Sequence, residues 1–275
     1  MIATLRYAAM RARAIVHEDA AERGVRSPAL VDAVLVLPFV GSLVVIGAWA
    51  DRPLFHLLTD DDRILEWLQF VGYAAATVLG ASIALRLWRA RQHVLGGLYL
   101  AFTAGCLFIT GEEVSWGQRI FDWDTPESLE RLNHQGETTV HNIGAVMGFT
   151  NGTMLLMGAV GAAAPWLAYR WRDRLPRDTV RLLVPPLFLT TAFLILFAYK
   201  ALRFTIFQHP QSATVSFGEW PELCLAYALG AFALVNRLAV QAPAPAMQAS
   251  APATQEAVPV ARRTEPERDQ LAARP

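Results

Sequence analysis

Two adjacent glutamates and a Glu-x-x-x-His pair stand close together in a chain that is otherwise strongly apolar. Glu112 and Glu113 open the string "GEEVSWGQRIFDWDTPESLERLNHQGETTVHN" (residues 111–142), and Glu137 and His141 lie near its end. Side chains four residues apart share one face of a helix, so Glu137 and His141 can offer a carboxylate oxygen and an imidazole nitrogen to one ion. With Glu113 they form a candidate set of ligands for a divalent metal such as zinc, manganese, iron or calcium.

Further polar residues extend this candidate site. A metal-bound water has a lowered pKa and can attack an ester or amide bond of a lipid, with Glu112 or Glu222 as general base. The other polar candidates are Glu66, Ser115, Gln118, Arg119, His134, His209 and Glu219. Arg119 would share a face with Glu112 if the helix that ends there continued, and His134 would join the metal ligands only if a helix reached back past Gly136.

The composition around these residues is that of a membrane protein. Of 275 residues, 54% are hydrophobic and 17% are charged, whereas a soluble domain carries about 25% charged residues. The formal net charge is zero, which gives no electrostatic support for a nucleic-acid partner. Membrane lipids are therefore the expected partners. Cys106 and Cys224 lie inside apolar runs and are interpreted as small buried side chains, not as a disulfide or a Cys-based metal site.

Six apolar runs approach or exceed the roughly 20 residues that a membrane-spanning helix needs. They cover residues 33–50, 64–88, 93–110, 143–169, about 182–199 and about 221–238. The fifth run is expected to form one helix with Pro185 and Pro186 in its first turns. Backbone groups must be hydrogen-bonded within each segment inside hydrocarbon, so these runs predict helices. The predicted fold class is an all-α polytopic transmembrane bundle over residues 28–240, with 111–142 as an outer-face loop. Residues 1–27 form a cytoplasmic N-terminal segment, and the Ala-, Pro- and charge-rich tail 241–275 is expected to be disordered.

Basic residues alternate between the connections of the six runs. Most of the 24 Lys and Arg residues fall in the N-terminal segment, in the second and fourth connections, and after the sixth run. The other three connections hold only Arg52, Arg63, Arg119, Arg131, Lys200 and Arg203. Because Lys and Arg accumulate on the cytoplasmic side of membrane proteins, both termini are predicted to be cytoplasmic. The candidate site residues then all lie at the outer leaflet.

The acidic residues also have a structural interpretation. Glutamate near the start of a helix is favoured by the helix dipole, which applies to Glu66, Glu137 and the pair Glu219 and Glu222. Glutamates at positions 112 and 113 end a helix, where the dipole disfavours anions. A second neighbouring carboxylate there requires a proton, a cation or water.

The string 111–142, with "DRILEWLQF" before it and "EWPEL" after it, resembles a group of uncharacterised bacterial polytopic membrane proteins. These share a "GEE-x-SWGQR" motif followed by "QGE" and "HN". The resemblance covers about residues 60–225 and implies a multi-pass protein of the bacterial inner membrane, but it carries over no activity. The intramembrane metal hydrolases that include alkaline ceramidases need an H-x-x-x-H pair, which this chain lacks.

Three functions are consistent with these patterns. The first is an enzyme that acts on lipid-like substrates at the outer leaflet, with a metal held by Glu113, Glu137 and His141. The second is a cation- or proton-linked transporter, and the third is a non-enzymatic structural or assembly protein. The apolar run 182–199 has no ionisable residue between Leu182 and Tyr199, which counts against a transport path through it.

Overall fold

The computed structural model describes residues 2–60, 63–121, 123–127, 131, 138–140, 143–207 and 212–241, with side chains at all of these except 2, 3, 119, 144, 145, 212 and 213. Every regular element in these residues is helical. Six segments among them are long and apolar enough to cross a membrane. The predicted all-α, multi-pass fold is therefore confirmed.

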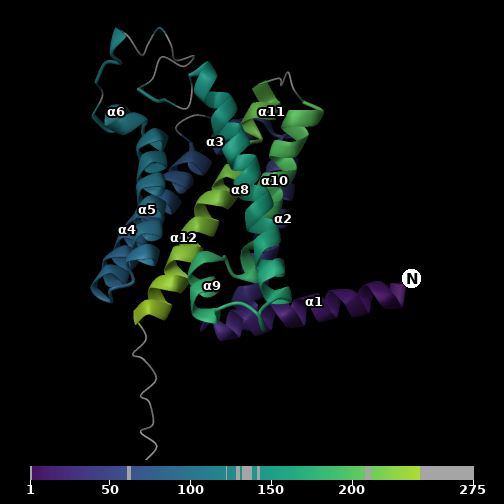
Figure 1. Cartoon of the computed structure of the whole chain (residues 1–275). Helices are drawn as coiled ribbons and strands as arrows, with labels where there is room; N and C mark the ends of the chain where they lie inside the picture. The colour runs from purple at the N-terminus through teal and green to yellow at the C-terminus, as the bar shows by residue number, and fades with distance from the viewer. Residues whose placement is uncertain are drawn as a thin grey trace, which may run out of the picture. The chain divides into compact units, whose positions relative to one another are not determined.

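Figure 1 shows the helices in their order along the chain. They are α1 (Ile2–Glu22), α2 (Pro28–Ala48), α3 (Arg52–Thr59), α4 (Ile64–Arg89), α5 (His93–Glu113), η1 (Ser115–Gly117), α6 (Gln118–Phe121), α8 (Gly144–Arg170), α9 (Arg177–Leu183), η2 (Leu187–Leu189), α10 (Thr190–Thr205), α11 (Ser212–Ser216) and α12 (Glu219–Gln241).

The fifth predicted span is broken into two helices. Pro185 and Pro186 follow α9, which ends at Leu183, and regular structure resumes only with η2 and α10. Proline lacks a backbone N–H and disfavours helical geometry in the residue before it, so the helix cannot run through this pair. The expectation that the two prolines sit within the first turns of one continuous helix is wrong.

The bundle is organised around α12. This helix packs against α4, α10 and α2, while α5 pairs with α4 and α8 pairs with α10. Glycines permit the closest approaches: a Cβ on Gly72 of α4 would lie 3.1 Å from the backbone of Ala226, and one on Gly158 of α8 would lie 2.7 Å from the Phe197 nitrogen. Membrane helices use small residues in this way because close backbone packing replaces the hydrophobic driving force.

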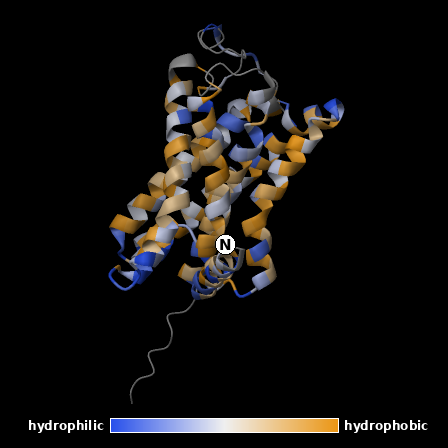
Figure 2. Cartoon of the chain, turned by 90° about the vertical axis from the view of Figure 1, so that its right-hand side faces the viewer, coloured by the Kyte–Doolittle hydropathy of each residue, from blue (hydrophilic) through white to orange (hydrophobic). Residues whose placement is uncertain are grey.

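The flanks of the bundle are apolar, whereas its ends carry the hydrophilic residues (Figure 2). Large apolar side chains on these flanks are strongly exposed, with Leu43, Val78, Val94 and Phe149 each at least 70% accessible. A soluble protein rarely exposes so much contiguous apolar surface, whereas hydrocarbon-facing helices require it.

The two ends of the bundle bring together different connections. We call one the arginine-rich end: there α1, α9, the start of α5 and the end of α12 meet, as the hydrogen bond from Asn236 to the Tyr99 hydroxyl illustrates. We call the other the acidic end. It gathers the starts of α4, α8 and α12 and the ends of α5 and α10, as the contacts of Lys200 with Asn151 and Glu222 illustrate. This grouping agrees with the predicted alternation of basic residues.

Candidate functional site at the acidic end

The chain turns sharply where α5 ends at Glu113. Ser115, Trp116 and Gly117 have φ values of 46°, 55° and 94°, so three successive residues adopt left-handed conformations. Such conformations in residues with a side chain cost of order 1–3 kcal/mol and persist only where surrounding contacts enforce them. The helix therefore does not continue, and the face that would have joined Glu112 to Arg119 does not form. The side chain of Arg119 lies outside the described residues.

The turn folds Trp116 back over the last turn of α5. Its indole N–H donates a hydrogen bond to Oε1 of Glu112, and its ring packs edge-on against Phe108, with 5.7 Å between ring centroids. A Cβ on Gly111 would lie 2.9 Å from the Trp116 ring. Glycine at position 111 and tryptophan at position 116 are therefore required by the same local packing.

Glu112 and Gln118 hold the chain at residues 138–140. Oε2 of Glu112 accepts the backbone N–H of Val140 at 2.8 Å, and Oε1 of Gln118 accepts that of Thr138 at 2.8 Å. The Gln118 amide also donates to the Thr125 hydroxyl at 2.8 Å. We call these contacts the clamp. Because both oxygens of the buried Glu112 carboxylate accept hydrogen bonds, its environment favours a positioning role over proton transfer.

An ion pair with a buried lysine joins three helices at the same end of the bundle. The Lys200 ammonium on α10 lies 2.8 Å from Oε1 of Glu222 on α12 and 2.8 Å from Oδ1 of Asn151 on α8. Lys200 is only 4% exposed. Sequence reasoning placed Lys200 in a connection and missed this role. The available signal was that Lys200 is the only lysine in a chain that otherwise uses arginine.

Further polar groups from α4 and α5 converge on the same place. The Gln69 amide donates to Oε2 of Glu219 at 2.8 Å. One turn further along α4, the Tyr73 hydroxyl is fully buried and has no hydrogen-bond partner among the described residues. The carboxylates of Glu113, Glu219 and Glu222 all lie within electrostatic range of that hydroxyl. We call Tyr73, Lys200 and these three glutamates the acidic cluster.

The candidate residues thus divide into three groups. Glu113, Glu219 and Glu222 come together in the acidic cluster, while Glu112, Ser115 and Gln118 build the turn and the clamp. Glu66 lies in the first turn of α4 at the same end. The remaining candidates, His134, Glu137, His141 and His209, lie outside the described residues.

The metal hypothesis depends on those undescribed residues. Within the described part of the chain, no three His, Cys, Asp or Glu side chains are arranged to hold a metal ion. The glutamates of the acidic cluster do not make such a site by themselves. A site that combines Glu113 with Glu137 and His141 stays a prediction.

Fold and site together define a multi-pass α-helical membrane protein with a buried, charged cluster at one end of its bundle. Comparison with models of protein families, with curated proteins and with solved structures finds no match to this chain.

Proposed function

We propose that this is a multi-pass protein of the bacterial inner membrane whose acidic cluster binds and acts on the polar group of a lipid-like molecule in the outer leaflet. The buried pair of Lys200 and Glu222 carries this proposal. In this orientation the arginine-rich end is cytoplasmic, as the distribution of basic residues favours. The resemblance of residues 111–142 to bacterial inner-membrane proteins is consistent with it.

A catalytic role explains the charged pair better than helix association alone. Removing an ammonium and a carboxylate from water is costly, and well-packed apolar residues in place of a buried ion pair are often as stable or more stable. Ionisable residues inside membrane bundles commonly mark functional sites. The Tyr73 hydroxyl, which has no hydrogen-bond partner among the described residues, lies within electrostatic range of Glu222 and supplies a further polar group that a bound molecule can engage.

The described residues supply groups for acid–base chemistry. Glu222 is the candidate general base, Lys200 can donate to an ester or phosphate oxygen, and Tyr73 can donate to a second one. The second part of the proposal is a divalent metal held by Glu113, Glu137 and His141. The metal would polarise the same ester or phosphate group as a Lewis acid.

Lipid composition tests the activity. A deletion strain is complemented with the wild type, Glu222→Gln, or Glu127→Gln, which makes the same change at an exposed glutamate that forms an ion pair with Arg131. We expect a lipid species to accumulate in the deletion strain and with Glu222→Gln, and to return to normal with Glu127→Gln. A lipid profile that is the same in all strains would remove the enzymatic proposal.

Metal content tests the second part. The purified protein is compared with Glu137→Gln/His141→Ala in a detergent that preserves folding. We expect about one metal ion per chain in the wild type and a loss in the double variant. A folded wild type without metal would rule out the metal and leave acid–base chemistry by Glu222 and Lys200 intact.

Reporter fusions test the orientation. A periplasmic reporter joined after residue 128 is expected to be active, and one joined after residue 175 is expected to be silent. The opposite result would place the acidic end in the cytoplasm.

The clamp favours a second candidate function, in which the polar residues only fix the loop and the helix ends of a structural or assembly protein. Glu112 and Gln118 bind backbone groups of the loop and need no ligand for that role. In that case Glu222→Gln would change stability and leave the lipid profile unaltered.

A further inference from the structure

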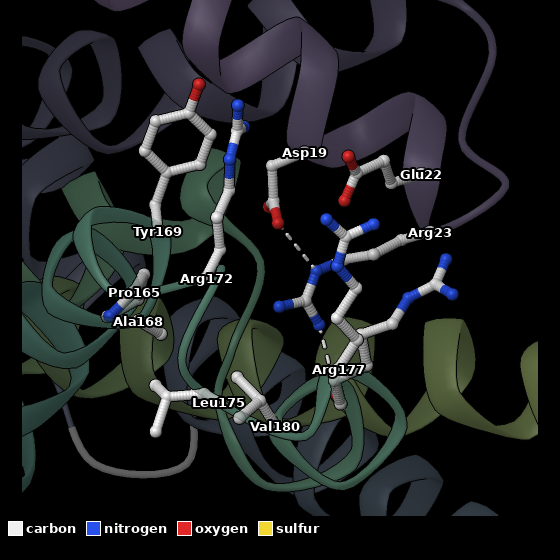
Figure 3. A pocket seen from close by; sticks show the side chains of 11 residues that line it. Asp19, Glu22, Arg23, Pro165, Ala168, Tyr169, Arg172, Leu175, Arg177 and Val180 are labelled. Atoms are coloured by element: carbon white, nitrogen blue, oxygen red, sulfur yellow. Dashed lines mark hydrogen bonds and ion pairs between the residues drawn. The ribbon is translucent and has the colours of Figure 1, made fainter.

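A pocket of about 220 Å³ opens at the arginine-rich end of the bundle. The end of α1, the end of α8, the turn after it and α9 line the pocket (Figure 3). Part of its wall is apolar, with Leu175 and Val180 among its residues, and the rest is charged. No residue of the acidic cluster lines this pocket. Any role of the pocket is therefore separate from the role of the cluster.

Several of the charges around this pocket are already neutralised by the protein. Arg23 binds Oδ1 of Asp19 at 3.0 Å and the carbonyl oxygens of Arg181 and Val184 at 3.0 and 3.1 Å. The other oxygen of Asp19 accepts the backbone N–H of Leu187 at 2.8 Å. These groups hold α1 against α9 and η2 and are not free to bind a ligand.

Arg172 is engaged in the same manner on the opposite side of the pocket. Its guanidinium lies 2.9 Å from Glu18, whose other oxygen accepts the Tyr169 hydroxyl at 2.7 Å. Figure 3 shows Tyr169 and Arg172 side by side in the wall of the pocket.

Two guanidinium groups remain without strong partners. Arg177 only approaches Asp173 at 3.8 Å, and both side chains are largely exposed. The Arg181 side chain has no ion pair or hydrogen bond within the described residues, and the same holds for Glu22 across the pocket. The pocket therefore presents two uncommitted positive charges against one negative charge.

The surroundings indicate that this end of the molecule lies at headgroup depth. α1 runs across the end of the bundle (Figure 1) and exposes Leu5, Tyr7 and Met10 beyond the packed part of the helix. Next to the pocket, Trp171 and Leu183 are also exposed. Tryptophan and tyrosine concentrate at the membrane–water interface, where lipid headgroups meet the protein.

We propose that this pocket binds the phosphate group of a phospholipid headgroup between the guanidinium groups of Arg177 and Arg181. Arginine suits this task because its planar fork can donate two parallel hydrogen bonds to phosphate oxygens. The acyl chains follow the apolar wall toward the exposed flank of the bundle. The Glu22 carboxylate repels a doubly charged inorganic phosphate more strongly than a phosphodiester, which carries one negative charge.

Native mass spectrometry of the delipidated, detergent-solubilised protein measures this binding. Dioleoyl phosphatidylethanolamine and dioleoyl phosphatidylglycerol are titrated in separate series, and inorganic phosphate is added as a competitor in a third. We expect one phospholipid per chain to bind to the wild type, with inorganic phosphate unable to displace it. Arg177→Gln/Arg181→Gln should weaken binding at least tenfold, as expected for the loss of charge-assisted hydrogen bonds.

Arg174→Gln is the matched control, because Arg174 lies in the same turn but does not line this pocket. It should bind lipid like the wild type. Arg181→Lys keeps the charge but not the planar fork, so its lipid affinity should lie between those of the wild type and Arg177→Gln/Arg181→Gln. If the double variant does not fold, Arg177→Gln alone replaces it. Equal lipid binding by the pocket variants and Arg174→Gln would overturn the proposal. Displacement of the lipid by inorganic phosphate with the same arginine dependence would also overturn it and assign the site to free phosphate.

Discussion

Two buried ion pairs stand at opposite ends of the bundle and are satisfied in different ways. At the arginine-rich end, the pair of Arg23 and Asp19 is enclosed by backbone groups: two carbonyls accept from the arginine, and one N–H donates to the aspartate. Backbone partners are fixed by the fold, so the geometry of this pair is fixed as well. Its function is to dock α1 onto α9 and η2.

At the acidic end, the pair of Lys200 and Glu222 has only side-chain partners among the described residues. Asn151 is the additional partner of the ammonium, and the neighbouring Tyr73 hydroxyl has none in the described residues. Side-chain partners can rearrange when a molecule binds or a proton moves. The comparison indicates that the first pair belongs to the architecture and that the second is suited to a ligand.

Double substitution should separate the two pairs most strongly. Lys200→Met and Arg23→Met are each expected to lower the free energy of unfolding by up to about 3–5 kcal/mol, because each leaves a partly buried carboxylate without its partner. Lys200→Met/Glu222→Met should recover most of this loss, since neither charge of the pair remains. Arg23→Met/Asp19→Leu should not, because it leaves two backbone carbonyls and one N–H without partners, at about 1–3 kcal/mol each.

Titration of the detergent-solubilised protein with a denaturing detergent gives these free energies of unfolding. Equal recovery at both ends would refute the distinction between a pair fixed by the backbone and a pair held by side chains. If Lys200→Met/Glu222→Met is stable as expected, it also serves as a folded, inactive control in the lipid assay.

The two clamp residues Glu112 and Gln118 offer a second, smaller contrast. Glu112→Ala removes a charged acceptor from the N–H of Val140 and the indole of Trp116, so we expect a loss of about 1.5–3 kcal/mol. Gln118→Ala removes neutral hydrogen bonds and should lose about 0.5–1.5 kcal/mol. Hydrogen exchange should show faster exchange of the Val140 amide in the first variant and of the Thr138 amide in the second. Unchanged protection at both amides would show that the clamp does not hold the loop.

Much of this architecture follows from hydropathy and charge. The apolar runs predicted six helices because hydrocarbon allows no other backbone solution for them, and the alternation of arginines predicted which connections share an end. The break at Pro185 was present in the sequence but underestimated. The prediction treated the prolines as first-turn residues, although a helix already preceded them.

The roles within the candidate site were less accessible to prediction. Helical spacing suggested a face shared by Glu112 and Arg119, but a left-handed turn at Ser115 and Trp116 ends the helix first. The backbone partner of Glu112 lies 28 residues further along the chain, and no periodicity reports such a contact. The convergence of Glu113 with Glu222 depends on α5 and α12 both lying against α4, which hydropathy does not encode.

Two buried tyrosines, one at each end of the bundle, allow the two ends to be compared by removing a single hydroxyl oxygen. The Tyr99 hydroxyl at the arginine-rich end donates to the Leu182 carbonyl at 2.7 Å and accepts from Asn236 at 2.6 Å. Tyr99→Phe should therefore lower the free energy of unfolding by about 1–3 kcal/mol. Tyr73→Phe removes a hydroxyl without a partner, so it should leave stability unchanged or raise it by less than about 1 kcal/mol. A large loss of stability in Tyr73→Phe would mean that this hydroxyl is already satisfied, and it would cease to be evidence for a ligand.

The smallest expected effect is a pH dependence confined to the arginine-rich end. The hydrogen bond from Tyr169, with Arg172, lowers the pKa of Glu18 below its ordinary value of 4.5. A carboxyl whose pKa is lower in the folded state contributes stability above its unfolded pKa and loses it as the pH falls through the folded value. Contact between α1 and α8 should thus weaken below about pH 4.5, because the protonated carboxyl no longer attracts Arg172. Spin labels on the exposed faces of α1 and α8 report the separation of the two helices as the pH falls. Asp32 also contacts Arg13 and His17 nearby. The difference in separation between wild type and Glu18→Gln therefore isolates the contribution of Glu18. Identical pH profiles for the two proteins would show that the other carboxylates govern the docking of α1.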